Sequence, residues 1–466
     1  MQIPIISGIY ADTDGEFRTS LPHNLQPVPK GQGISAGYLR PAEGLVEISA
    51  GIGFDRGGIE WRDELYRVQG SRLVKVSSNG GVSDIGGVGG SGQVTFDYSF
   101  DHLAVSSGGK LFLYDGATLT QVTDPDLGTV ISFIWIDGRF LTTDGESMVV
   151  TELNDPFSVD PFDFGSSEVD PDPILSVLEL SNEVYAINAN SIEVFSDVGG
   201  TGFPFQRIPG AQVQKGSVGT FASTVFDGAI AFVGGGRNQP PAVYLAAGGR
   251  TQKISSREID KILGDHSTVE LKNIVTEERE FDQHSLLYIH LPKQTLVFDA
   301  AGSKSVGKLV WYTLSGGTLV KTQYPARNFV YVYDKWIAGD PFTGRLAETT
   351  YSVSTQFGAE ISWDFGIEIL YNEGRGAIIH NLELVCLTGN VALGLNPVVT
   401  TDWSIDGLTW SQPVTVSAGK QGDRATRVSW RRQGAFKNWR IQRFSGSTDA
   451  HLTIARLEAS IEGLSV

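Results

Sequence analysis

The segment Glu183-Val184-Tyr185-Ala186-Ile187-Asn188-Ala189-Asn190-Ser191-Ile192-Glu193-Val194-Phe195 contains two apolar strands on either side of a polar turn. The same unit of strand, turn and strand recurs at residues 64–76, 102–116 and 285–299. Successive copies are separated by roughly 40 residues, the length of a four-stranded propeller blade. We therefore predict an all-β fold in which residues 58–354 form a β-propeller.

The repeats are degenerate, without a Trp-Asp pair or a double glycine at fixed positions, so the predicted number of blades is six or seven. The blades are expected at residues 58–90, 92–126, 128–170, 173–215, 216–256, 273–314 and 322–352, of which the last is the weakest repeat. A set of stacked meanders or two β-sandwiches is the alternative. A single helix is predicted at residues 255–264, where Ser255 or Ser256 caps the start and Gly264 ends it.

The composition supports this class of fold. The chain has 466 residues, 41% of them hydrophobic, which is enough for a sizeable core. It contains 56 glycines, well above the ~7% usual in globular proteins, and these fall between short apolar runs as turn residues do. Only two methionines occur, and long runs of helix-forming residues are missing.

The regions on either side of the repeats differ from them. Residues 1–57 contain prolines at positions 22, 27, 29 and 41, which predict an irregular arm packed across other parts of the molecule. In residues 355–466 the strands alternate with turns every 8–12 residues, a pattern typical of a separate β-sandwich.

Charge and cysteine content exclude several classes of protein. Lys and Arg number 36 and Asp and Glu 53, so the net charge is −17, the wrong sign for a protein that grips nucleic acid along its surface. The single cysteine, Cys386, excludes an intrachain disulfide and a thiolate zinc cluster. Met1-Gln2-Ile3-Pro4 lacks secretory features, and no apolar run approaches the ~18 residues of a membrane span. We expect folding in a reducing cytoplasm and no membrane insertion.

Two short motifs resemble functional signatures. Residues 87–92, GVGGSG, match the dinucleotide fingerprint, but a strand follows where a helix is required, so a loop between blades is the better interpretation. Residues 404–410, SIDGLTW, are similar to the Asp box of sialidase-type propellers, which is itself structural, and Asp-Gly between strands is a strong hairpin signal.

Acidic and histidine residues give no clear active site. Six carboxylates occur between Asp155 and Asp172 among prolines, which indicates a solvated loop rather than a calcium site or a glycosidase pair. His284 and His290 lie on one strand face but too far apart to share a metal. The sequence thus predicts no catalytic residue, no metal site and no cofactor.

A basic strip near the C-terminus runs against the overall charge, with aromatic residues among its cations. Partner contact, ordinary solvated strand faces and nucleic-acid binding all fit such a strip, and in so acidic a protein we favour a partner or subunit interface. The candidate interface residues are Arg424, Arg427, Arg431, Arg432, Lys437, Trp439, Arg440 and Arg443, together with Tyr38 and Arg40 near the N-terminus.

Five fragments spread over most of the chain are GYLRPAEGL (37–45), SIEVFS (191–196), VQKGSVGT (213–220), EFDQHSLLYIHLP (280–292) and TDWSIDG (401–407). In this order they resemble the packaged-DNA stabilisation proteins of short-tailed phages, also called tail hub, tail accessory or nozzle proteins. The resemblance implies a structural protein of the virion tail without enzymatic activity, assembled in the host cytoplasm. Related nozzle proteins look like propellers flanked by a platform and sandwich domains, which makes residues 1–57 the expected platform contact.

The resemblance also implies partners. The chain would form a ring, a homohexamer, below the portal and its adaptor, close the DNA channel after packaging, and carry a tail needle, tailspikes or fibres. Double-stranded DNA would pass through transiently and without sequence recognition. The rival hypothesis is a glycan-binding or glycan-cleaving propeller, either a receptor-binding tail protein or a depolymerase. A bacterial scaffold propeller with protein partners is a third possibility.

Overall fold

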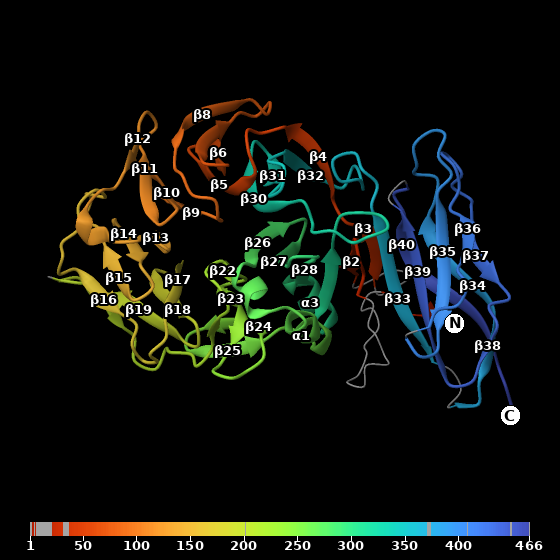
Figure 1. Cartoon of the computed structure of the whole chain (residues 1–466). Coiled ribbons are helices and arrows are strands. Elements are labelled where there is room, and N and C mark those ends of the chain that lie inside the picture. Colours follow the sequence, from red (N-terminus) through yellow and green to blue (C-terminus); the bar gives the residue numbers. More distant parts are fainter. Residues whose placement is uncertain are drawn as a thin grey trace.

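A computed structural model describes residues 2, 3, 5, 21–30, 37–200, 202–370, 374–407, 409–447 and 450–465. Strands dominate it, and two β-rich units lie beside one another, the larger coloured orange to green and the smaller mostly blue (Figure 1). The larger unit has seven sheets that follow one another along the sequence, and the smaller has two sheets. The predicted β-propeller and C-terminal β-sandwich are thus confirmed, with seven blades.

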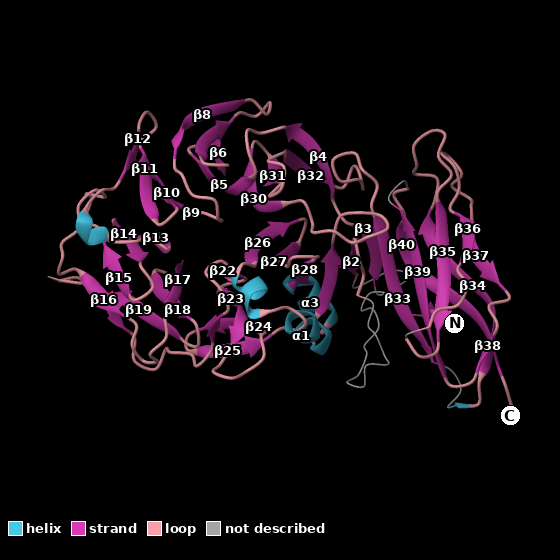
Figure 2. Cartoon of the chain, in the orientation of Figure 1, coloured by secondary structure: helices cyan, strands magenta, loops and turns pink. Residues whose placement is uncertain are grey.

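Each blade is an antiparallel sheet built mainly from consecutive strands (Figure 2). The first three blades are β5 (Asp55–Trp61), β6 (Glu64–Gln69), β7 (Arg72–Val76) and β8 (Val82–Gly87); β9 (Thr95–Tyr98), β10 (Leu103–Ser107), β11 (Lys110–Tyr114) and β12 (Leu119–Gln121); and β13 (Ser132–Ile136), β14 (Arg139–Thr143), β15 (Ser147–Val150) and β16 (Phe164–Ser166). The next two are β17 (Ile174–Leu180), β18 (Glu183–Asn188), β19 (Ile192–Asp197) and β20 (Phe205–Arg207); and β21 (Gly216–Ser217), β22 (Ser223–Phe226), β23 (Ala229–Gly235), β24 (Ala242–Ala247) and β25 (Arg250–Lys253). The last two are β26 (Val275–Phe281), β27 (His284–His290), β28 (Thr295–Asp299) and β29 (Val310–Leu314); and β30 (Arg327–Val332), β31 (Lys335–Gly339), β32 (Leu346–Thr350) and β4 (Gly44–Ser49).

The blades close into a ring. The first strands of neighbouring blades contact one another in turn, and β30 of the seventh blade contacts β5 of the first. The seventh blade takes its outermost strand, β4, from the N-terminal region, with Leu45 opposite Thr349. Because the chain leaves and re-enters this blade, hydrogen bonds between distant segments hold the ring closed.

The middle strands explain the continuous apolar runs in the sequence. Every residue of β27 is buried, since the neighbouring blades cover both faces of the sheet. Six of the seven blades join their first two long strands by a two-residue turn in which both residues have positive φ, for example Ser181-Asn182 and Asp282-Gln283. Such turns match the right-handed twist of the flanking strands and fix the register of each hairpin.

The smaller unit is a β-sandwich. One sheet contains β1 (Gln2–Ile3), β2 (Leu25–Pro29), β3 (Gly37–Pro41), β40 (Thr453–Gly463), β34 (Ala377–Leu387), β37 (Val428–Arg431) and β38 (Ala435–Phe436). The other contains β33 (Ser362–Leu370), β39 (Trp439–Ser447), β35 (Val398–Ser404) and β36 (Val414–Ser417). The core between them is aromatic, because Phe365 and Phe444 of one sheet stack and Trp430 of the other packs on Phe444.

The N-terminal segment is more regular than the expected arm. Its described residues supply three strands to the sandwich, β1, β2 and β3, and one to the propeller, β4. Pro27 and Pro29 lie in β2, which is an edge strand of its sheet, where a missing N–H group leaves no ladder bond unmade. The prolines at positions 27 and 29 therefore indicate an edge strand rather than irregular structure. The connection that follows is short, because only Ala42 and Glu43 separate the sandwich strand β3 from the propeller strand β4.

Helices are few and short. The predicted helix is confirmed as α1 (Arg257–Gly264), which follows Ser256 and buries Ile259 and Leu263. The other helices among the described residues are η1 (Pro125–Leu127), α2 (Thr268–Lys272) and α3 (Ala300–Val306).

Candidate interaction surfaces

The basic strip is divided between the two sandwich sheets. Arg427 and Arg431 belong to or flank β37, whereas Arg440 and Arg443 lie on β39 of the opposite sheet. Side chains alternate between the two faces of β39, and residues 440, 442 and 444 are all buried in the core. Arg440 therefore faces the core, whereas Arg443 faces the other side of the sheet. The structure therefore does not bring the strip together as one surface.

Arg440 is fully buried between the sheets. Its Nε donates to Oε1 of Gln442 at 2.9 Å, one terminal nitrogen donates to the carbonyl of Gln433, and the guanidinium lies 4.6 Å from the ring centroid of Trp403. Burial lowers its pKa to about 10. A side chain in this position does not reach a partner, so the structure corrects the prediction of an interface role for Arg440.

Two other cations of the strip already have partners in the chain. Arg427 makes a two-pronged ion pair with Glu383, which raises the pKa of the arginine and lowers that of the glutamate. Arg443 pairs in the same way with Asp402 and stacks on Trp410, its guanidinium 4.1 Å from the ring centroid. These contacts lie within the sandwich.

Four cations of the strip remain exposed, and they are Arg424, Arg431, Arg432 and Lys437. They are spread along β34 rather than gathered in one patch, because Arg424 lies beside Gly389 at one end of that strand and Lys437 beside Gly376 at the other. We call the adjacent pair Arg431 and Arg432 the cationic end. Among the residues that the structure describes, none of the four makes an ion pair with a carboxylate. Trp439 lies half-buried at the start of β39. The cationic end is therefore the part of the predicted interface that is still open to a partner.

Arg40 links the two units instead of facing solvent. Its guanidinium lies 3.7 Å from the ring centroid of Tyr351 at the end of the seventh blade and donates to the Tyr351 hydroxyl at 2.7 Å. It also donates to Asp282 at 3.1 Å and to Gln26 at 3.2 Å. Tyr38 is half-buried on the same strand, with the Lys30 ammonium 5.4 Å from its ring centroid.

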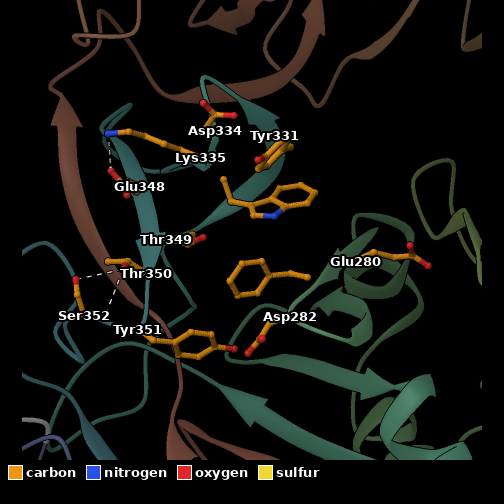
Figure 3. Close-up of a pocket in the computed structure, with 12 residues that line it drawn as sticks. Glu280, Asp282, Tyr331, Asp334, Lys335, Glu348, Thr349, Thr350, Tyr351 and Ser352 are labelled. Atoms are coloured by element: carbon orange, nitrogen blue, oxygen red, sulfur yellow. Dashed lines mark hydrogen bonds and ion pairs between the residues drawn. The ribbon is translucent and has the colours of Figure 1, made fainter.

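An open groove of about 690 Å³ lies between the sixth and seventh blades (Figure 3). We call it the acidic groove, because one cation, Lys335, and four carboxylates line it beside four aromatic rings. The lining residues that carry these groups are Glu280, Asp282, Asp334, Glu348, Phe281, Tyr331, Trp336 and Tyr351. Lys335 is paired with Glu348 at 2.8 Å, so the groove keeps an excess of negative charge.

A buried ion pair supports the groove from within the molecule. Arg279 of β26 makes a two-pronged pair with Glu43, the residue before β4, and both side chains are almost fully buried. The guanidinium lies 4.7 Å from the ring centroid of Phe281 and 4.9 Å from that of Trp336. The aromatic residues of the groove are thus held in place by a cation on their buried side.

A serine, a histidine and an aspartate meet where the propeller joins the sandwich. Nε2 of His23 lies 2.7 Å from Oγ of Ser315, and Nδ1 of His23 lies 2.9 Å from a carboxylate oxygen of Asp364. Burial lowers the pKa of His23. For Asp364, burial alone would raise the pKa, but the hydrogen bond from His23 and the Lys321 ammonium outweigh it and lower the pKa to about 2.

The serine, histidine and aspartate contact one another in the same spatial order as in the catalytic triad of serine hydrolases, but their position does not suit catalysis. A catalytic hydroxyl must reach its substrate, whereas Ser315 and His23 are buried, with 0% and 1% of their surfaces exposed. The imidazole contacts Asp364 through one ring nitrogen and Ser315 through the other, away from solvent. The cluster joins three distant segments as a structural link.

The other motifs take structural positions. Residues 87–92 begin at the last residue of β8 and continue into the loop before β9, where Arg56 donates to the carbonyls of Gly89 and Gly92. In the Asp-box-like turn, Asp406 accepts hydrogen bonds from the backbone and hydroxyl of Thr409. His284 and His290 have separate partners, Asp299 at 2.6 Å and Glu277 at 2.6 Å.

The loop of residues 155–172 uses its carboxylates within the chain. Asp170 pairs with Arg237 at 2.6 Å, and Asp172 accepts hydrogen bonds from the backbone of Asn190 and the hydroxyl of Ser191. Within the described ranges, no group of three or more His, Cys, Asp or Glu side chains is placed to hold a metal ion. None of the helices in the described part of the chain has the length and apolar character to cross a bilayer.

Sequence reasoning missed both the acidic groove and the His23 cluster. The residues of the cluster are 292 and 341 positions apart, so no local pattern joins them. The groove has a weak signal in the sequence: aromatic and acidic residues surround two turns, Asp282-Gln283 and Tyr333-Asp334, of adjacent blades. That signal becomes useful only when the blade register is known.

A seven-bladed propeller joined to a β-sandwich, with polar links at the junction, defines the molecule as a rigid two-unit scaffold. Residues 1–352 match the family described as bacteriophage P22 Gp10, beta-propeller, and residues 362–462 match bacteriophage P22 Gp10, beta-sandwich. The chain therefore belongs to the phage P22 Gp10 family. The tail hub protein gp10 of Salmonella phage P22 is 27% identical to it over 459 residues, which is 94% of this chain and 94% of the relative.

This relationship confirms the expected class of function, a structural protein of a phage tail, and gives no support to the glycan-binding alternative. Among solved structures, the WD40 domain of Neurospora crassa Pan2 is 9% identical with a TM-score of 0.42, covering 66% of this chain and 95% of that one. PorZ of Porphyromonas gingivalis is 12% identical with a TM-score of 0.41, covering 80% of this chain and 46% of that one.

Proposed function

We propose that this chain is the hub of a short phage tail. It assembles as a hexameric ring below the portal and its adaptor, closes the DNA channel after packaging, and carries the needle, tailspikes or fibres beneath. The similarity to the P22 tail hub protein, which covers 94% of each chain and includes both units, carries this proposal. Assembly takes place in the host cytoplasm, and the chain performs no catalysis in this role.

The architecture suits a part that bears mechanical load. A closed propeller leaves few free sheet edges, and β4 joins the last blade to a segment 300 positions away in the sequence, Thr349 lying opposite Leu45. The Arg40 and His23 contacts tie the sandwich to this ring. Such a scaffold transmits force between an adaptor above and a needle below without unfolding at an edge.

The charge suits a DNA channel. Six chains of net charge −17 together carry roughly −100 charges. Where part of this charge faces the lumen, it repels the phosphates of passing DNA, so that the DNA slides without binding. A ring whose lumen-facing residues are neutral or basic would contradict this part of the proposal.

The cationic end of the sandwich contacts other subunits and the adaptor. Its two exposed arginines lack carboxylate partners within the described chain, while the protein as a whole is acidic. A basic patch on an acidic protein attracts an acidic neighbour and sets its orientation.

Electron microscopy of particles that lack this chain tests the proposed function. Heads that package DNA and then lose it, leaving shells without tails, are the expected result. Restoring the chain from a plasmid serves as the control and should restore both DNA retention and tails. DNA-filled heads with complete tails that fail only to adsorb would overturn the proposal.

A further inference from the structure

The two ends of the acidic groove are built alike. Figure 3 shows Tyr351 beside Asp282 at one end and Tyr331 beside Asp334 at the other, with Thr349 between them. At the first end, Arg40 of the same chain stacks on Tyr351 and donates to Asp282. An aromatic face with an adjacent carboxylate suits a guanidinium, which stacks on aromatic rings and pairs with carboxylates.

The second end offers the same groups, and its one cation, Lys335, is already paired with Glu348. Among the described residues, no arginine stacks on Tyr331. Tyr331 is 53% exposed, and Glu280 and Asp334 are exposed carboxylates with no ion pair among the described residues. Thr349, which lines the groove between the ends, is buried, and its Oγ1 has no hydrogen-bond partner in the described structure. Buried polar atoms without partners are rare in folded proteins, and a guanidinium carries five donors.

The chain also carries cations without partners, in the cationic end. Arg431 and Arg432 are adjacent and exposed, Arg431 as the last residue of β37 and Arg432 directly after it. In Figure 1 this part of the sandwich, next to β38, lies well away from β31 and β32, which border the groove. One chain therefore does not fill its own groove with these arginines.

We propose that the acidic groove of one copy binds Arg431 and Arg432 of a second copy, a guanidinium stacking on Tyr331 and pairing with Asp334 or Glu280. The two surfaces are different patches of the same molecule, so each copy offers its groove to one neighbour and its arginines to the other. Contacts of this head-to-tail kind generate closed rings when the rotation between copies closes. This inference rests on the proposed hub ring and names the contact that builds it.

A charge-exchange experiment on the purified full-length chain tests the contact. The groove variant carries Glu280→Lys and Asp334→Lys, and the arginine variant carries Arg431→Glu and Arg432→Glu. In either variant alone, like charges face each other, and association should weaken on the order of tenfold or more, as measured by sedimentation velocity. Mixed in equal amounts, the two variants can alternate around a ring, with every contact again between opposite charges.

The expected result is therefore that the mixture assembles although neither variant does alone. Matched controls change the same number of charges elsewhere: Asp101→Lys with Glu146→Lys for the groove variant, and Lys110→Glu with Lys308→Glu for the arginine variant. All four control residues are exposed. Both control proteins should associate like the unmodified chain, and circular dichroism should show all variants folded.

Two outcomes separate this inference from the proposed function. A groove variant that still forms normal rings, or two defective variants that do not rescue each other, overturns the groove contact and leaves the hub proposal standing. Particles that retain DNA and have complete tails in the absence of the chain overturn the hub proposal, and the ring contact with it.

Discussion

The Nε2 atom of His23 lies 2.7 Å from the Oγ atom of Ser315, across the junction between the sandwich and the propeller. His23 precedes a sandwich strand and Ser315 follows the last strand of the sixth blade, while Asp364 on the other ring nitrogen belongs to the second sandwich sheet. The link thus fastens the two units through buried hydrogen bonds rather than through surface charge.

Removing the imidazole should weaken this junction. In a His23→Ala variant, the buried Ser315 hydroxyl and one Asp364 oxygen lose a partner, which costs about 1–3 kcal/mol of folding free energy. Urea unfolding at pH 7.5 measures the loss. His102→Ala is the control, since His102 is a half-buried histidine of the second blade that takes no part in the junction, and an equal loss there would contradict the role given to His23.

His23 should also make stability depend on pH. Burial lowers the pKa of His23 below its ordinary value of 6.5, so as pH falls below about 6.5 the unfolded chain binds a proton more readily than the folded chain does. Stability therefore falls on acidification from pH 7 to pH 5, by at most about 1.4 kcal/mol per pH unit for this group. A His23→Gln variant should show a shallower dependence in urea unfolding at each pH, and a dependence as steep as that of the unmodified protein would contradict the assignment.

The buried pair of Arg279 and Glu43 should be far more important than a surface pair. Glu43→Gln leaves the Arg279 guanidinium buried without a counter-charge, which costs about 3–5 kcal/mol. The matched control is Asp84→Asn, which breaks the exposed pair with Arg72 and should cost less than about 1 kcal/mol. Equal losses in denaturant unfolding of the two variants would contradict the structural role of the buried pair.

Arg440 and Arg431 should separate folding from assembly. Arg440→Met removes the donors to Gln433 and Gln442 inside the sandwich, so we expect a loss of about 1–3 kcal/mol but normal association of the folded chain at low temperature. Arg431→Met should show the opposite, an unchanged melting temperature and weaker association. Thermal melts and sedimentation velocity on both proteins distinguish the two roles.

The C-terminal unit should not fold without the N-terminal strands. A fragment with the predicted boundaries 355–466 lacks β2 and β3, and with them Leu25 and Leu39, which are buried in the sandwich core. We expect this fragment to show no cooperative thermal transition by circular dichroism. Fusion of residues 21–41 ahead of it through a flexible linker should restore one, and a cooperative transition in the shorter fragment would contradict the shared core.

The sequence was sufficient for those parts of the fold that depend on local order. Apolar runs, two-residue turns and their spacing predict the blades, and the helix at 255–264 follows from its end residues. Pairings between distant segments were beyond this reasoning: nothing near Leu45 indicates that it pairs with Thr349. The same limit applies to the basic strip near the C-terminus. Its sequence does not show that the side chain of Arg440 is buried in the sandwich core while that of Arg431 is exposed to solvent.

The short connection through Ala42 and Glu43, between the sandwich strand β3 and the propeller strand β4, has a consequence for synthesis on the ribosome. Leu45 pairs with Thr349, and Leu39 pairs with Ile454. The strands that are translated early can therefore pair only after the late strands have been synthesised. Pairings over such separations form slowly and leave sheet edges open in the nascent chain. The hub subunit therefore becomes competent for tail assembly after translation is nearly complete, and chains truncated by premature termination carry unpaired strands that favour aggregation over incorporation into a virion.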